Sequence, residues 1–417
     1  MKKNEVQMNI KNYIPNPVLS LFIRFMFFSV IFLFSTVAVS CSSDASQTTS
    51  TVPISYESTS VSETTPETKD SSITTVTEAS ITETTTGVKW VEPSENINPL
   101  TGKADMDPDN YNKRSVAIVV NNHYAAIPQR GLHRADVIYE YETESGQTRL
   151  LALFADISAV PEIGPIRSAR ILSADLCAGT NSIFIHFGSN WRVPDHLKQY
   201  GIQAVDGNVM CASSGHSVDG KITLSKNLFF YRDDKWRKER AIEHSAVTNG
   251  ELIRGAIDFK SISTEGETPF LFPFVTSESP SLEGGLPCTD LTVYFSATNC
   301  DSNFKYDKDV MMYTKYQYGG KAQIDEITGE MIFVKNVIIL FADIRSHGDP
   351  TIDAFLENGG TGYYASDGKI IEITWEKPTP TSSIELFDKD GNPVMVNAGR
   401  SYINVVRQTR ESKTQWE

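Results

Sequence analysis

The sequence predicts an α+β protein with a mixed α/β N-terminal domain followed by a β-rich C-terminal domain. Residues 88–265 alternate short apolar, strand-like runs with helix-like segments. Residues 285–417 hold only short alternating runs, separated by turn pairs such as Asp-Gly and Gly-Gly. From residue 259 to residue 287 four prolines break both patterns. We therefore place a domain boundary between residues 265 and 285.

In the N-terminal domain, β-branched and apolar runs predict four strands. They cover residues 115–121, 136–142, 147–156 and 182–188. The pair Ser145-Gly146 predicts a hairpin turn between the second and third strands. Three segments with helical periodicity complete this domain, at residues 168–177, 195–200 and 248–259.

In the C-terminal domain, even spacing of short strands predicts a β-rich sheet or a small barrel. The expected strands cover residues 291–296, 310–318, 331–341, 362–365, 370–375, 384–387 and 402–406.

The first 40 residues predict a secretory signal peptide. Lysines near the start precede an uninterrupted apolar run at 25–39, which is short for a transmembrane helix. The run ends in Ala38-Val39-Ser40, directly before Cys41. This is the arrangement of a bacterial lipoprotein, although Ala38 stands where leucine is usual. We expect cleavage before Cys41 and lipidation of its thiol with diacylglycerol and palmitate-like chains; the alternative is an uncleaved signal anchor.

Residues 41–87 begin with the lipidated cysteine and continue as a Ser/Thr-rich tether. More than half of residues 42–86 are serine or threonine, and large apolar side chains are few. Such a segment cannot bury enough apolar surface to fold. A flexible chain of this length spans roughly 35–40 Å. We expect the tether to hold the folded part at the extracytoplasmic face of the cell membrane, away from the bilayer.

The net charge of −14 argues against nucleic acid as a partner. Four cysteines remain beyond Cys41, and none forms a C-x-x-C pair, so we expect no metal site and no cofactor. In an exported protein these cysteines can form disulfides, and local pairing would join Cys288 to Cys300 and Cys177 to Cys211. The alternative is four buried thiols.

Several ordered blocks resemble the YerB-like bacterial lipoproteins. In the N-terminal half they are NPLTG (98–102), AIVVNN (117–122), PQRGLHRADVIYE (128–140), TRLLALF (148–154) and GPIRSAR (164–170). In the C-terminal half they are GTGYYASDGKIIEITWEKP (360–378), FDKDGNPV (387–394) and NAGRSYINVV (397–406). The resemblance implies a two-domain extracytoplasmic lipoprotein. It implies no catalytic residues.

The strongest candidate site is the block 164–170. Ser168 is expected to cap a helix, and Arg167 and Arg170 are three positions apart. A helix N-terminus beside two guanidinium groups can bind a carboxylate or phosphate. The alternative is a structural role, in which Arg167 or Arg170 pairs internally with Glu140, Glu142 or Asp136.

His186 ends an apolar strand and could add to a polar pocket beside the two arginines. A histidine at the end of an apolar strand is, however, more often a hydrogen-bonded core residue. His244 follows a charged run at 232–243, which is expected to be a solvated face.

These observations predict a membrane-anchored binding protein for an anionic wall fragment or a protein partner. The alternative is a hydrolase or transferase acting on envelope polymer, which needs a nucleophile beside a base. No G-x-S-x-G motif is present. A third reading is an interaction scaffold without a pocket. The available nucleophiles and bases are Ser168, Ser214, Cys211, His186, His216 and His244.

Overall fold

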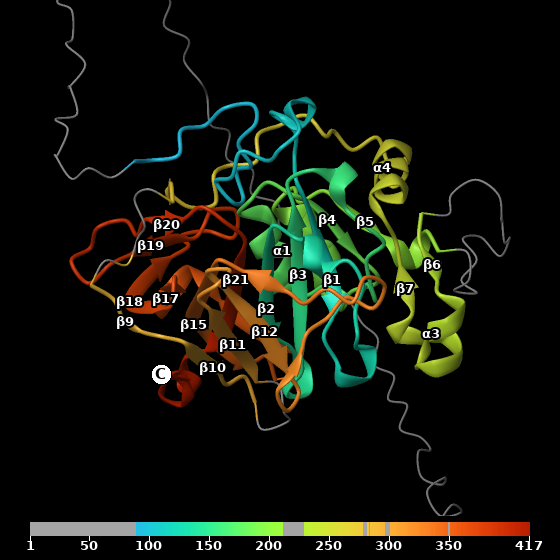
Figure 1. The fold of residues 1–417 in the computed structure, drawn as a ribbon. Coiled ribbons are helices and arrows are strands. Elements are labelled where there is room, and N and C mark those ends of the chain that lie inside the picture. Colours follow the sequence, from blue (N-terminus) through green and yellow to red (C-terminus); the bar gives the residue numbers. More distant parts are fainter. Residues whose placement is uncertain (1–88, 212–228, 278–281, 283, 297–300, 349–350) are drawn as a thin grey trace, which may run out of the picture. The chain divides into compact units, whose positions relative to one another are not determined.

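The computed structural model describes residues 89–211, 229–277, 282, 284–296, 301–348 and 351–417. The predicted signal peptide, Cys41, the tether, His216, Ser214 and Cys300 lie outside these ranges. The described residues form one compact unit (Figure 1). Its strands and short helices confirm the predicted α+β class, with the helices in the N-terminal half and a β-rich C-terminal half.

The N-terminal half contributes five strands to a large central sheet. β2 and β3 form the predicted hairpin, whose turn residues Ser145 and Gly146 both have positive φ, as its tight reversal requires. β1 is antiparallel to β3 and parallel to β4, and β4 is parallel to β5. The strands are β1 (Val116–Asn121), β2 (Val137–Glu142), β3 (Thr148–Phe154), β4 (Ile183–His186) and β5 (Ala204–Asp206).

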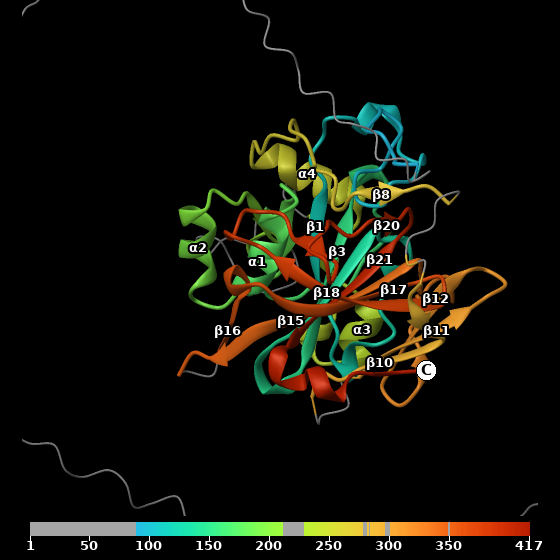
Figure 2. The same cartoon turned by 90° about the vertical axis from the view of Figure 1, so that its left-hand side faces the viewer.

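Strands of the C-terminal half extend the same sheet to twelve strands within the described residues. β21 lies between β15 and β2 and is parallel to both, so the two halves share one continuous ladder. Figure 2 shows how strongly the sheet twists, because β15 and β18 cross the direction of β1 and β3. The added strands are β15 (Asn336–Ser346), β17 (Gly360–Ser366), β18 (Lys369–Glu376), β19 (Glu385–Phe387) and β21 (Ser401–Arg407), with β9 (Leu286–Pro287) and β16 (Ile352–Phe355) at their margins.

A second sheet of six strands packs on one face of the central sheet, since Leu291, Phe304 and Tyr313 join the same apolar cluster as Val120 and Val337. The predicted strand at 331–341 is two strands, one in each sheet. The C-terminal half is therefore two sheets and no barrel. The second sheet contains β10 (Asp290–Val293), β11 (Ser302–Asp307), β12 (Met312–Gln317), β13 (Lys321–Ala322), β14 (Phe333–Val334) and β22 (Gln415–Trp416).

The helices cover the N-terminal part of the sheet. α1 (Ile171–Ala178) and α2 (Val193–Gln199) place apolar residues in one core cluster, and α4 (Gly250–Phe259) places its residues in the other, on the opposite face. The charged run at 232–243 contains a further helix, α3 (Asp234–Glu239), whose Trp236 is fully buried. The run is therefore only partly a solvated face. Short pairs β6 (Tyr231–Arg232) with β7 (Ala246–Val247) and β8 (Phe274–Val275) with β20 (Val396–Asn397) complete the unit.

A buried polar network centred on Glu140 joins the two halves. The hydroxyl of Tyr402 donates to the Glu140 carboxylate at 2.8 Å, and that of Thr148 does so at the same distance. Ser302 Oγ is a third donor, and Lys315 Nζ lies 3.7 Å away in a fully buried position. Because a buried carboxylate without donors would be very costly, this network fixes how β2, β11 and β21 meet.

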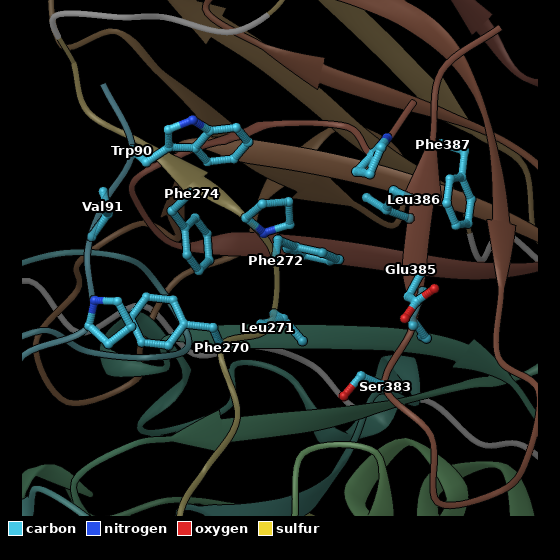
Figure 3. Close-up of a pocket in the computed structure, with 14 residues that line it drawn as sticks. Trp90, Val91, Phe270, Leu271, Phe272, Phe274, Ser383, Glu385, Leu386 and Phe387 are labelled. Atoms are coloured by element: carbon cyan, nitrogen blue, oxygen red, sulfur yellow. The ribbon is translucent and has the colours of Figure 1, made fainter. Parts of the chain in front are cut away.

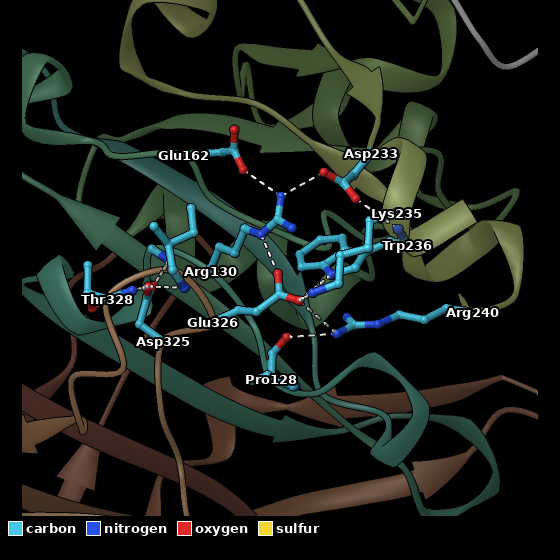
Figure 4. A network of polar contacts seen from close by, with 12 residues as sticks. Pro128, Arg130, Glu162, Asp233, Lys235, Trp236, Arg240, Asp325, Glu326 and Thr328 are labelled. Atoms are coloured by element: carbon cyan, nitrogen blue, oxygen red, sulfur yellow. Dashed lines mark hydrogen bonds and ion pairs between the residues drawn. The ribbon is translucent and has the colours of Figure 1, made fainter. Parts of the chain in front are cut away.

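A second junction surrounds Arg130 (Figure 4). Its guanidinium donates to Glu162 and Glu326 at 2.6 Å each and to Asp233 at 2.9 Å. Trp236 lies against this guanidinium, 4.0 Å from the ring centre, and donates its indole N–H to Glu326. Glu326 belongs to the C-terminal half, so this cluster ties the loop after β13 to α3.

Candidate functional site

The block 164–170 runs between two loops at one edge of the central sheet. On one side, Asn121 N donates to Pro165 O at 2.8 Å and Arg167 N donates to Val119 O at 2.9 Å. On the other side, Phe187 N donates to Arg167 O at 3.0 Å. The block therefore lies where β1 and β4 end, which is the edge where α/β sheets commonly bind ligands.

Ser168 does not cap the helix. α1 begins at Ile171, and Arg170 occupies the N-cap position, where its amide donates to Ser173 Oγ at 3.0 Å. The predicted helix start was wrong because residues 167–169 are extended and held by neighbouring loops. Ser168 still belongs to the site, because its carbonyl accepts a hydrogen bond from Arg149.

Arg170 has an internal partner. Its Nε and Nη2 donate to the two carboxylate oxygens of Glu144 at 2.6 and 2.8 Å. Glu144 lies in the hairpin turn between β2 and β3, so this pair fastens the turn to the start of α1. Internal pairing was foreseen as the structural alternative, but with other carboxylates.

Arg167 is half-buried, and its guanidinium makes no hydrogen bond or ion pair with any residue that the structure describes. Burial lowers the pKa of Arg167, and the nearby charge of Glu243 acts in the opposite direction. A guanidinium has five N–H donors, so this side chain has capacity for an anionic ligand.

Arg149 is the residue that the sequence analysis missed. It sits at the start of β3 and is only 8% exposed, yet within the described ranges it has no carboxylate partner. Its one hydrogen bond there goes to the carbonyl of Ser168. Burial, followed by the charges of Arg170 and Arg167, lowers the pKa of Arg149 to about 9. We call Arg149, Arg167 and Arg170 the arginine cluster.

Two stacked histidines lie near Arg167, and their pKa values are lowered. The rings of His123 and His244 lie 5.2 Å apart and nearly parallel. Burial, and then the charge of Arg167, lowers the pKa of His244 to about 4 and also lowers that of His123. The amide of Asn121 lies 2.7 Å from His244 Nδ1, as expected for a neutral ring that accepts this hydrogen bond.

His186 does not join the arginine cluster. It is buried, and its Nδ1 lies 2.9 Å from the carbonyl oxygen of Gly188. Burial lowers its pKa. Its ring faces the core cluster that contains Phe184, so it matches the core-residue alternative.

The predicted bridge between Cys177 and Cys211 is absent. Cys177, Cys211 and Cys288 are all buried and in the thiol form. The sulfur of Cys177 instead donates to the carbonyl of Ser182, and burial raises its pKa. Cys288 is also in the thiol form, and its predicted partner Cys300 lies outside the described residues. Spacing along the chain could not reveal the directions of these side chains.

Among the described residues, no histidine is hydrogen-bonded to a serine, threonine or cysteine side chain. Nor do three metal-ligating side chains gather anywhere in that part of the chain. None of its helices is long and apolar enough to cross a membrane.

An apolar groove of about 590 Å³ opens elsewhere, at the start of the described chain (Figure 3). Aromatic rings line it, among them Trp90, Phe270, Phe272 and Phe387. Its single ionisable lining residue is Glu385. The groove therefore offers little for binding an anion or for proton transfer, and we place the candidate site at the arginine cluster.

The fold and this site together define an α+β protein whose two halves share one sheet, with a cationic cluster where β1 and β4 of the N-terminal half end. Family models match both halves, and the chain belongs to the family described as protein of unknown function DUF3048, with the N-terminal domain at residues 100–263 and the C-terminal domain at 291–403. This confirms the resemblance to YerB-like proteins. The chain is 32% identical to the candidate lipoprotein YerB of Bacillus subtilis (strain 168) over 315 residues, which cover 74% of this chain and 85% of YerB. The crystal structure of Bacillus subtilis YerB has a similar fold, with a TM-score of 0.61 and 28% identity over 74% of this chain and 96% of that chain.

Proposed function

We propose that the protein is a lipid-anchored, extracytoplasmic binding protein whose arginine cluster takes an anionic ligand. The ligand supplies a carboxylate or phosphate, from an envelope molecule or from the surface of a partner protein. The observation that carries the proposal is the buried position of Arg149 without a carboxylate partner in the described chain. Buried charges in proteins are normally paired, so a cation held in this way is suited to an incoming anion.

Arg167 supports the same proposal from a more accessible position. It lies on the same block, and its guanidinium has no partner among the described residues. By contrast, Glu144 already engages Arg170. We therefore assign ligand contact to Arg149 and Arg167 and assign a positioning role to Arg170.

The binding test compares Arg167→Gln with Arg254→Gln, an exposed arginine of α4 that serves as a matched control. The purified chain is titrated by calorimetry with polyglutamate and with oligogalacturonate. Loss of one charged hydrogen bond, worth about 1.5–3 kcal/mol, should weaken binding at least tenfold for Arg167→Gln and leave the control unchanged. If neither polyanion binds the parent chain, or if both variants behave alike, the proposal fails.

The lipid anchor rests on the sequence around Cys41 and on the name of the YerB relative. A processed lipoprotein carries more than one acyl chain, which stable membrane attachment requires. Mass spectrometry of cell-purified protein should find an acylated Cys41 at the N-terminus, and Cys41→Ser should release the protein from the membrane. An intact initiator methionine, or an unmodified thiol at a new N-terminus, would exclude this anchor.

A further inference from the structure

We infer that the anionic ligand is an acidic oligosaccharide, held at the arginine cluster between the exposed rings of Tyr124 and Trp191. The inference rests on the proposed function and adds the ligand class. Both aromatic rings are unusually exposed to solvent. Among the large apolar and aromatic side chains of the described residues, Trp191 and Tyr124 are the two most exposed, at 71% and 64%.

Both rings belong to the loops that flank the arginine block. On one side, β1 ends at Asn121, which is hydrogen-bonded to Pro165, and Tyr124 follows three residues later. His123 connects the two features, because its ring contacts Tyr124 at 4.2 Å and stacks on His244.

On the other side, the chain after β4 runs parallel to the block. Ala169 pairs with Ser189 in a parallel bridge, and Ala169 N donates to Gly188 O at 2.9 Å. Trp191 follows two residues after Ser189, in the turn that leads into α2. The arginine block therefore lies between one loop that bears Tyr124 and another that bears Trp191.

This arrangement matches the chemistry of a charged sugar. The face of an aromatic ring carries negative partial charge and packs well against the C–H groups of a sugar ring. Guanidinium groups bind the carboxylate or phosphate of the same ligand. Within the described residues, the hydroxyl of Ser168 makes no hydrogen bond, so it can bind a sugar hydroxyl.

The spacing favours an oligomer. The loop that bears Tyr124 follows a contact with Pro165 at the start of the block, and the loop that bears Trp191 follows a contact with Ala169 near its end, so the two rings flank different ends of the block. A single sugar ring cannot stack on both. The chain's net charge of −14 disfavours unspecific binding of polyanions, so the acidic group must be received at the cluster itself.

The experiment uses the full mature chain and four probes: oligogalacturonate, phosphorylated maltohexaose, neutral cellohexaose and polyglutamate. Tyr124→Ala and Trp191→Ala should each weaken binding of an acidic sugar at least fivefold and leave polyglutamate binding unchanged. The matched control is Trp90→Ala, an exposed tryptophan in the apolar groove, which should change neither. The two acidic sugars distinguish a carboxylate from a phosphate.

The outcomes separate the two proposals. If polyglutamate binds as tightly as the acidic sugars and both aromatic variants bind like the parent, the sugar inference is overturned while anion binding stands. Equal affinity for cellohexaose would overturn the acidic character of the ligand. If none of the four probes binds, the proposed function fails as well. Because both side chains are exposed, unchanged thermal unfolding of the variants will show that the fold is intact.

Discussion

Replacing Arg149 with methionine should make the ligand-free protein more stable. Lowering the pKa of a guanidinium from 12.5 to about 9 means that burial and the neighbouring arginine charges together disfavour its charged form by about 5 kcal/mol. The hydrogen bond to Ser168 returns about 2 kcal/mol, the ordinary value for a charged donor. Methionine has similar length and no charge to bury. We expect Arg149→Met to raise the free energy of unfolding by about 3 kcal/mol, within the range found when buried charges are replaced by apolar residues.

The assay is urea unfolding in a buffer free of multivalent anions. Arg254→Met is the control, because an exposed arginine should change stability by no more than about 0.5 kcal/mol. An anion that binds the site should stabilise the parent and not Arg149→Met. The difference between their free energies of unfolding should therefore shrink when that anion is added. The pKa of Arg149 is lower in the folded state than in the unfolded state. The amount by which Arg149 lowers the free energy of unfolding is therefore full below pH 9 and should diminish as the pH rises through that value.

If Arg149→Met instead loses more than about 2 kcal/mol without ligand, the arginine is a structural residue. A loss of that size would mean that the guanidinium is well satisfied in the free protein. The reasoning that connects its burial to anion binding would then be refuted.

Two further tests of stability concern the Arg130 junction and His244. Glu326→Gln leaves the buried Arg130 short of a charged partner and should lower the free energy of unfolding in urea by about 3 kcal/mol. The control Lys235→Ala removes only an exposed partner of Glu326 and should lower it by under 1 kcal/mol. Equal effects would contradict the assigned role of Glu326. The pKa of His244 is about 4 when folded and near 6.5 when unfolded, so the unfolded chain binds the proton first and stability should fall as the pH drops from 6.5 to 4. After allowance for solvent screening this loss is about 2 kcal/mol, and His244→Asn should abolish that slope; an unchanged slope would assign it to other groups.

The sequence predicts the apolar elements of this fold well. β1, β3 and β4 are runs of branched and aromatic residues, and their period and length identify them. β11 (SNFKYD) was missed because four of its six residues are polar and only its inward side chains are buried. α3 was missed for a related reason, since its one buried side chain, Trp236, lies within a highly charged run.

The site was predictable only in part. The block 164–170 is recognisable because glycine, proline and two arginines stand together in an acidic chain. Arg149 is hidden, because an arginine at the start of an apolar strand gives no sign that its head will be buried. The carbonyl of Ser168, which accepts its hydrogen bond, is brought to it by a tertiary contact. The partner of Arg170 was hidden in the same way, because the turn that carries Glu144 is brought to α1 by the hairpin.

The C-terminal half supports the arginine cluster from both sides without contributing a cation to it. Ser296 Oγ donates at 2.6 Å to the carbonyl of Gly146, in the turn that carries Glu144. Glu326 binds the indole of Trp236 in α3, directly before the segment that carries Glu243. Glu144, the partner of Arg170, thus lies in a turn held by the second half, and Glu243 follows a helix that the second half contacts. A free N-terminal half would lose those contacts, and so the balance of charge that keeps Arg149 and Arg167 open to an anion requires both family domains in one chain.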